Sequence, residues 1–367
     1  MMMMNNPTML SYIRREQTVL GSLLSAYPDA TAKALANVPK HTQHWLILTT
    51  ASSLNAAKSA QPYMEKMANI QVDVRDAGAY LTYGHVNPAV DTIIGISLSG
   101  TDPIILAAVK RAETGTQATT IAMTAQMDSE LVSGTATSFN LLTGKETIPY
   151  ITLSYNAIVL SLMFLSLRSA ADRDLLPVLA VNQELDDFGL IIEHINETIQ
   201  RANDYYRKFT IDFGLATEFT SIGASSLAGT LAEMQTKFTE IVRVPTHGYP
   251  LTEFIHGAYL GAHETHRQFY LEMPTDPTVM ATLQAVKTYE SRLTPHIYTI
   301  SFTGEQPTLN DEQTLMLYPI EDPLKVPLLA IIPFQVLAWF IAKAKGINLS
   351  HPIFDNFQAS LKTNSES

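Results

Sequence analysis

Three ionisable residues lie at helical spacing in the second half of the chain. The stretch from Thr230 to Ile241 contains Glu233, Lys237 and Glu240, which are four and then three residues apart. That spacing places two carboxylates and one amine on the same face of a helix. The ordinary explanation of such a pattern is a solvated face with i,i+4 ion pairs.

The residues around this helix favour a chemical role instead. A serine turn precedes the helix, and His247, Glu253 and His256 follow it within a short stretch. A sugar isomerisation needs a carboxylate to move a carbon-bound proton and a second group to open the ring. Because both types are present, we predict that the three helix residues and His256 form the catalytic set.

Two hydroxyl-rich turns in the first half are suited to hold a phosphate. Ser52-Ser53 and Ser97-Leu98-Ser99-Gly100-Thr101 each lie between a predicted strand and a predicted helix. In an open α/β sheet, ligands bind at the carboxyl ends of the strands, where helix amides and hydroxyls hold phosphate. Such residues are most often helix caps, but two turns in one domain favour a binding site. A nucleotide P-loop is a poorer explanation, because Thr101 stands where a lysine is required.

An internal repeat indicates how these residues are positioned. Ala51-Ser52-Ser53-Leu54 recurs as Ala224-Ser225-Ser226-Leu227, and in each copy a β-like run precedes the serines and a helical pattern follows them. Further β-like runs follow at Val72–Val74 and Val242–Val244. This alternation is typical of βαβ units around a parallel sheet. We therefore predict an α/β protein with two tandem domains, each a flavodoxin-like three-layer α/β/α sandwich.

The domain boundaries follow from the repeat. Asn182–Arg207 has apolar residues at helical spacing and predicts a connecting helix. The apolar run Val326–Ala342 reaches the lower limit of a membrane span, but it contains Pro333 and Gln335, which favours a buried helix. The predicted organisation is an N-terminal helix at 1–30, a first domain at 31–175, a connecting helix at 176–212, a second domain at 213–346 and a tail at 347–367.

Composition excludes several classes of function. Asp and Glu number 35 against 24 Lys and Arg, giving a formal charge of -11, so a nucleic-acid partner is not expected. The absence of cysteine excludes disulfides, a thiol nucleophile and thiolate metal sites, and it fits a cytoplasmic protein. The first residues lack the features of a signal peptide. No cofactor and no membrane partner are expected.

A short histidine pair suggests a metal site at first sight. In His263-Glu264-Thr265-His266 the histidines are three residues apart, whereas the zinc protease motif needs them four apart. An exposed polar turn explains the segment equally well, so no metal site is predicted.

Taken together, these residues resemble the tandem sugar isomerase (SIS) domain family, which includes the isomerase half of glucosamine-6-phosphate synthase and the fructoselysine and glucoselysine 6-phosphate deglycases. The resemblance runs from Met9-Leu10-Ser11-Tyr12-Ile13 with Glu16, similar to the family's opening helix, to near Pro352. The run Ser97 to Asp102 resembles the family's phosphate loop, and Ser53 matches a hydroxyl of the preceding turn. Leu98 and Asp102 depart from that loop, in which glutamine and threonine stand.

The second domain matches the synthase pattern without a gap from Gly223 to Gly257. The resemblance implies that Glu240 moves the proton between the first two sugar carbons and that His256 assists ring opening across a dimer interface. It also implies that Glu233 and Lys237 position the substrate and tune the base. A homodimer, with tetramers as a further step of assembly, is the expected state.

One departure bears on the choice of reaction. Five residues after Pro352, where the synthase has a lysine that reaches the sugar, this chain has Phe357, and the nearest lysine is Lys362. The resemblance therefore favours a deglycase, which cleaves a 6-phosphorylated sugar–amino acid into a hexose phosphate and an amino acid. The alternatives are an aldose–ketose isomerase of a phosphorylated hexose or hexosamine and, from another class, a non-catalytic sugar-phosphate sensor.

Overall fold

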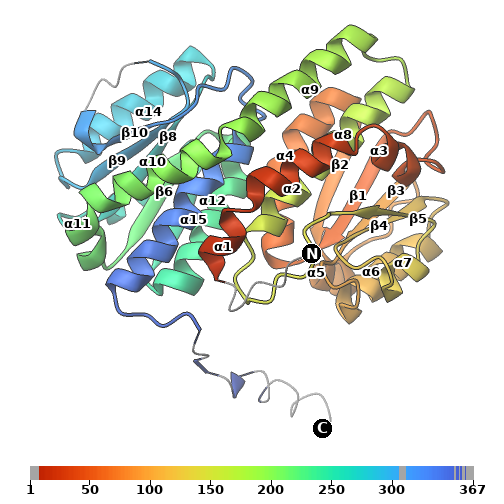
Figure 1. Cartoon of the computed structure of the whole chain (residues 1–367), viewed down its shortest axis with the longest axis horizontal. Helices are drawn as coiled ribbons and strands as arrows, with labels where there is room; N and C mark the ends of the chain where they lie inside the picture. Colours follow the sequence, from red (N-terminus) through yellow and green to blue (C-terminus); the bar gives the residue numbers. More distant parts are fainter. Residues whose placement is uncertain (1–7, 306–310, 351–352, 355, 358–359, 361–367) are drawn as a thin grey trace.

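Two parallel sheets, one in each half of the chain, form the framework (Figure 1). A computed structural model describes residues 8–305, 311–350, 353–354, 356–357 and 360. Each sheet has five strands and is covered by helices on both faces. The predicted α/β class with two tandem three-layer sandwiches is confirmed.

The first sheet has the strand order β2-β1-β3-β4-β5. Its strands are β1 (His44–Thr49), β2 (Gln71–Asp76), β3 (Thr92–Ile96), β4 (Thr119–Thr124) and β5 (Thr137–Asn140). Strands β1 and β3 are buried along their whole length, as continuous apolar runs in a parallel sheet must be. Helices α4 (Ala51–Ala68) and α8 (Leu153–Asp172) pack on one face, and α5 (Ala77–Tyr83), α6 (Pro103–Thr114) and α7 (Glu130–Ser133) on the other.

The second sheet repeats this topology with the order β10-β9-β8-β6-β7. Its strands are β6 (Phe219–Gly223), β7 (Thr246–Pro250), β8 (Arg267–Glu272), β9 (Ile297–Ser301) and β10 (Thr314–Met316). Helices α12 (Ala228–Lys237) and α15 (Pro327–Ala344) cover the inner face, and α13 (Leu251–Phe254) and α14 (Pro277–Glu290) the outer face. In both sheets the order is that of flavodoxin-like folds, with the ligand crevice expected beside the first strand.

One predicted strand was misplaced. Val242–Val244 is not a strand, because α12 continues into a π-helical turn, Phe238–Val242, and Arg243 then takes a left-handed conformation with φ 60°. Strand β7 begins only at Thr246. Because of the π turn, β7 begins later after its serine segment than β2 does in the first copy.

The segments outside the sheets are helical as well. The connecting segment consists of two helices, α9 (Val178–Glu193) and α10 (Ile195–Lys208), which meet at His194, and α11 (Thr210–Leu215) leads into the second sheet. At the start of the chain lie α1 (Met9–Ile13), α2 (Glu16–Ser25) and α3 (Asp29–Ala34). Pro352 and Lys362, which entered the prediction about the reaction, lie outside the described residues. The domain boundaries stay a prediction.

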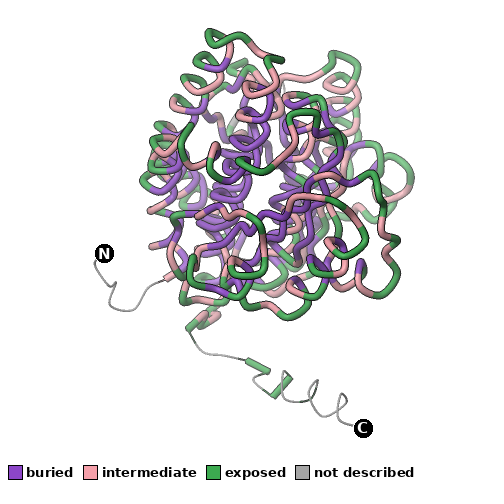
Figure 2. Tube along the Cα trace, turned by 90° about the vertical axis from the view of Figure 1, so that its right-hand side faces the viewer, coloured by how far each residue is buried: buried purple, intermediate pink, exposed green. Residues whose placement is uncertain are grey.

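The two most apolar helices lie in the interior. By length and composition α8 and α15 are the two helices of the described chain that fit a membrane span, yet 94% and 83% of their most apolar windows are buried inside the molecule. Figure 2 shows the buried positions running through the middle of the molecule, with the exposed ones at its rim. The prediction that Val326–Ala342 is a buried core helix is confirmed by α15.

A carboxyl group is enclosed among these central helices. Glu16 of α2 is fully buried, and its Oε2 accepts a hydrogen bond of 2.6 Å from Asn156 Nδ2 of α8. The second oxygen of Glu16, Asn156 Oδ1 and Gln335 Oε1 of α15 have no partner among the described residues. Burial raises the pKa of Glu16 well above its usual value, against hydrogen bonds from Asn156 and Gln335 that lower it. Protonation of Glu16 removes the buried charge and turns one of its oxygens into a hydrogen-bond donor.

We expect Glu16→Gln to stabilise the protein at pH 8. Because the folded-state pKa is raised, the contribution of Glu16 is fully present below pH 4.5 and is lost as the pH rises through the folded value. The neutral amide avoids this loss, which for a charged group exceeds the roughly 1–3 kcal/mol typical of an unsatisfied buried neutral group. Guanidinium unfolding at pH 5 and pH 8 measures it.

The matched control is Glu193→Gln, which changes an exposed glutamate of α9. We expect a gain that grows from pH 5 to pH 8 for the Glu16 variant and no such trend for the control. A Glu16 variant less stable than the parent protein at pH 8 would contradict a neutral carboxyl at this position.

Candidate functional site

The two domains meet where α4 crosses α12. A Cβ atom on Gly229 of α12 would lie 2.5 Å from the backbone oxygen of Asn55 and 2.4 Å from Ser59 Oγ, both on α4. Only glycine therefore permits this approach. Beside it, Ser59 Oγ lies 3.3 Å from Thr230 Oγ1 of α12. The crossing brings the first turns of α4, which follow the serine turn, against the predicted acid–base helix.

Glu233 is anchored across this crossing. Its side chain is fully buried, and its Oε2 accepts a hydrogen bond of 2.9 Å from Asn55 Nδ2, which also donates to Thr236 Oγ1 at 3.2 Å. Burial raises the pKa of the Glu233 carboxyl, against the charge of Lys237 and hydrogen bonds from Asn55 and Ser52. Glu233 therefore does not lie on a solvent-exposed helix face, as the ordinary explanation by i,i+4 ion pairs would require. Asn55 was not predicted as a site residue.

Lys237 lies between the two carboxylates. Its Nζ is 2.8 Å from Glu240 Oε2 and 3.6 Å from Glu233 Oε1, and its side chain is 1% exposed. Burial alone lowers the pKa of Lys237, but the charges of Glu233 and Glu240 outweigh that effect and raise it. The amine is therefore held as an ammonium group. The structure brings together all three predicted helix residues.

Glu240 is the accessible member of the group. It lies in the π-helical turn after α12, and 42% of its side chain is exposed. Single π-helical turns are frequent at functional sites because they redirect side chains out of the regular helical pattern. The arrangement leaves one carboxylate, oriented by a fixed cation, free to contact a ligand.

His256 is not brought to this group within one chain. It lies just after α13 and is exposed, and no hydrogen bond or ion pair of its side chain is found in the described part of the molecule. Its backbone N–H donates to the backbone carbonyl oxygen of Glu253 at 3.2 Å. Among the described residues, the His256 side chain thus has no bond to the ion-paired group of Glu233, Lys237 and Glu240.

The serine turns lie at the carboxyl ends of β1 and β3, as predicted. Ser52 and Ser53 are buried in the first turn of α4. Before them Ala51 has φ 50°, a left-handed conformation that costs a non-glycine residue on the order of 1 kcal/mol and recurs at ligand sites. Because the Ser52 hydroxyl is near enough to lower the pKa of Glu233, this turn adjoins the acid–base helix.

The second turn is held by its own side chains. Ser97 Oγ accepts a hydrogen bond of 3.1 Å from the Gly100 N–H, and Ser99 Oγ accepts bonds from the N–H and hydroxyl of Thr101 at 3.3 and 3.0 Å. Asp102 caps α6, its Oδ1 accepting from the N–H groups of Ile104 and Ile105 at 2.9 and 3.3 Å.

A further hydroxyl, which was not predicted, adjoins this turn. Gly100 has φ 66°, and a Cβ there would lie 2.0 Å from the oxygen of Ser129. Ser129 is buried, and its hydroxyl has no partner among the described residues. No signal in the sequence marks it, because Ser129 belongs to the loop after β4.

The histidine pair lies at the amino end of the second sheet. His266 Nε2 is 2.8 Å from Thr220 Oγ1, and His263 pairs with Glu218, all near the amino ends of the strands. No group of three or more metal-binding side chains occurs among the described residues.

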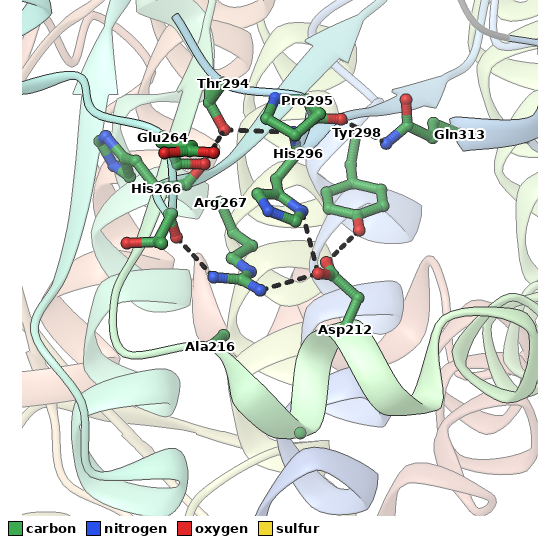
Figure 3. Close-up of polar contacts among 12 residues, drawn as sticks. Asp212, Ala216, Glu264, His266, Arg267, Thr294, Pro295, His296, Tyr298 and Gln313 are labelled. Atoms are coloured by element: carbon green, nitrogen blue, oxygen red, sulfur yellow. Dashed lines mark hydrogen bonds and ion pairs between the residues drawn. The ribbon is translucent and has the colours of Figure 1, made fainter.

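The neighbouring polar cluster at this amino edge has a structural role. Figure 3 shows Arg267, at the start of β8, beside Asp212 of α11, to which it donates. Asp212 also accepts from His296 Nδ1 at 2.9 Å and from Tyr298, and Arg267 also donates to the Thr265 carbonyl. The short helix α11 is thereby fixed to the sheet. Hydrogen bonds from Arg267 and Tyr298 lower the pKa of Asp212 despite burial, which raises it.

With this geometry in place, the class of protein is defined by comparison. Residues 40–168 match the SIS domain model, and the second sheet repeats the topology of the first. Residues 40–168 are thus identified as a SIS domain, and the second half of the chain has the same strand order, which confirms the resemblance seen in the sequence.

Known proteins are similar over nearly the whole chain. A glutamine–fructose-6-phosphate aminotransferase (isomerizing) from Synechocystis sp. is 22% identical over 373 residues, covering 94% of this chain and 57% of its own length. The chain thus spans about half the length of the curated relatives it matches.

Solved structures show the same fold. The C-terminal domain of a glucosamine-fructose-6-phosphate aminotransferase from Francisella tularensis has a TM-score of 0.82 at 20% identity, covering 95% of this chain and 99% of that one. A glucosamine-6-phosphate deaminase from Thermotoga maritima has a TM-score of 0.74 at 18% identity, with coverages of 94% and 97%.

We expect Lys237→Met to destabilise the protein more than the double substitution Glu233→Gln with Lys237→Met. The single change leaves the Glu233 carboxylate buried without its cation, which costs about 3–5 kcal/mol. The double change removes both charges and keeps an acceptor for Asn55. Urea unfolding of the two variants tests this, and equal destabilisation would show that Lys237 does not compensate a buried charge.

Proposed function

We propose that this protein is a sugar-phosphate enzyme that cleaves a 6-phosphorylated sugar–amino acid, glucoselysine or fructoselysine 6-phosphate, into a hexose phosphate and the amino acid. The observation that carries the proposal is the ion-paired group on α12, with buried Glu233 and Lys237 orienting the accessible Glu240. It adjoins the hydroxyl-rich turn at the start of α4. A cytoplasmic homodimer is part of the same proposal.

The proposed reaction needs one base and one water molecule. Glu240 removes the proton from the carbon that bears the nitrogen and returns it to the neighbouring carbonyl carbon. The N–H proton passes to the carbonyl oxygen, so that the carbonyl becomes an alcohol and the amine becomes an imine. Water then adds to the imine carbon and the carbon–nitrogen bond breaks, which releases the amino acid. Lys237 fixes the position of Glu240, and Glu233 fixes Lys237.

The comparisons support the choice of substrate class. The Synechocystis relative is named for fructose 6-phosphate and an amino-group transfer, and the Thermotoga structure for removal of an amine from glucosamine 6-phosphate. Phe357 in place of the lysine expected at that offset argues against a synthase reaction. The runner-up is an aldose–ketose isomerase, which uses the same base and releases no amine. The third candidate, a non-catalytic sensor, has no need of Glu240.

Glu240→Gln should abolish the release of lysine from glucoselysine and fructoselysine 6-phosphate. Loss of a general base typically costs about 10²–10⁴-fold in rate. Free lysine is measured by a coupled assay. The matched control is Glu113→Gln, because Glu113 pairs with Lys110 at 2.9 Å with the same i,i+3 spacing as Glu240 with Lys237.

The control should keep full activity. Unchanged lysine release by the Glu240 variant would remove the catalytic assignment and favour the sensor. If no lysine appears with the parent protein while the sugar phosphate isomerises, the isomerase reading replaces the deglycase.

His256 is proposed to complete the site of a partner chain, where it assists ring opening. Glu240→Gln and His256→Asn chains, each inactive alone, should therefore recover activity when they are unfolded and refolded together. Random pairing gives half mixed dimers with one intact site each, so about one quarter of the parent activity is expected. A mixture that stays inactive would place both residues in one chain's own site.

A further inference from the structure

The turn proposed to bind phosphate offers little positive charge. The run from Ser97 to Asp102 contains no Lys or Arg, and Lys110 and Arg111 of α6 are bound to Glu113 and to backbone carbonyls. The N–H groups of Gly100 and Thr101 are already bonded to serine oxygens of the turn. Among the side-chain donors of the turn, the hydroxyl hydrogens of Ser97 and Ser99 have no acceptor in the described part of the molecule, whereas the Thr101 hydroxyl donates to Ser99.

A carboxylate stands beside these hydroxyls. Only Oδ1 of Asp102 has hydrogen-bond partners among the described residues, the two N–H groups at the start of α6. The other oxygen has no such partner and remains an acceptor at the end of the same turn. A fully ionised oxyanion is repelled by it, whereas one that carries a proton can donate that proton to it.

The corresponding aspartate of the second copy shows which part of the role of Asp102 is helix capping. Thr275-Asp276-Pro277 repeats Thr101-Asp102-Pro103, and Asp276 caps α14 through the Thr278 N–H at 2.8 Å. Without a gap, the buried residues Leu271 and Met273 stand where the first copy has Ser97 and Ser99. The second copy therefore has the aspartate but not the serine hydroxyls. Helix capping accounts for an aspartate in both copies, but the effect of Asp102 on a ligand belongs to the first copy alone.

We propose that Asp102 makes the turn selective for an oxyanion that carries a proton, so that the ligand bound is the monoanion of a phosphate ester. The proposal rests on the phosphate site of the proposed function and adds a specificity-determining residue to it. The second pKa of a phosphate ester is about 6, so the bound form becomes scarce above that pH. A sulfate ester, which has no such proton, is excluded.

The test compares glucose 6-phosphate with glucose 6-sulfate by calorimetry at pH 5.5 and 7.5. The parent protein should bind the phosphate at least about 10-fold more tightly than the sulfate at pH 5.5, and its phosphate affinity should fall toward pH 7.5, by up to about 10-fold per unit above the ester pKa.

Asp102→Asn should lose both properties and bind phosphate and sulfate alike at both pH values. Asparagine caps helices as well as aspartate does, so the variant keeps the start of α6. Asp276→Asn makes the same change in the second copy and should behave as the parent protein.

The outcomes separate the two proposals. If the parent protein binds phosphate and sulfate equally, or if the Asp102 variant keeps the parent's selectivity, Asp102 does not select the ligand, while the phosphate site stands. If neither the parent protein nor the variants bind glucose 6-phosphate or fructose 6-phosphate, the phosphate site itself is wrong and the selectivity proposal falls with it.

Discussion

Close packing of α4 against α12 is the contact on which the geometry of the site depends. Because Gly229 has no side chain, the α4 backbone approaches near enough for Asn55 to reach Glu233 at 2.9 Å. One turn along, Ser59 is 2.7 Å from Tyr155 of α8 and thus ties the crossing to the centre of the first domain. The two domains share one hydrophobic core through these helices. Their relative position, and so the distance between the serine turn and Glu240, is set by packing rather than by a hinge.

Electrostatics then divides the roles of the two carboxylates. Lys237 is a single positive charge between two acidic groups, so the group carries an excess of one negative charge when all three are ionised. The interior cannot solvate that excess, and burial raises the pKa of Glu233 accordingly. Glu240 has 42% of its side chain exposed and is the carboxylate that water or a ligand can reach. Glu233 is therefore the enclosed member of the group and Glu240 the accessible one, which is why Glu240 is the residue proposed as the base.

Features with a local signal were predictable from the sequence. The strands at 45–48 and 92–96, the helix at 103–113 and the repeat each follow from neighbouring residues, and the structure contains them all. Other features depend on tertiary contacts. The hydrogen-bond partner of Asn55, Glu233, is 178 residues away in the sequence. The π turn after α12 is not marked by any local spacing of apolar residues. The exposed position of His256 depends in the same way on how the chain folds after β7.

The repeat explains why two similar domains would build one composite site. Helices α4 and α12 are corresponding helices, since α4 begins with the first Ala-Ser-Ser-Leu segment and α12 begins directly after the second. At the positions of Glu233, Lys237 and Glu240 the first copy has Ala60, Met64 and Met67, which pack in the core or against it. At the position of Asn55 the second copy has Ala228. One helix thus carries the serine turn and the anchor, and the other carries the ionisable groups. Neither copy contains both sets, so the crossing of the two helices is what creates the site.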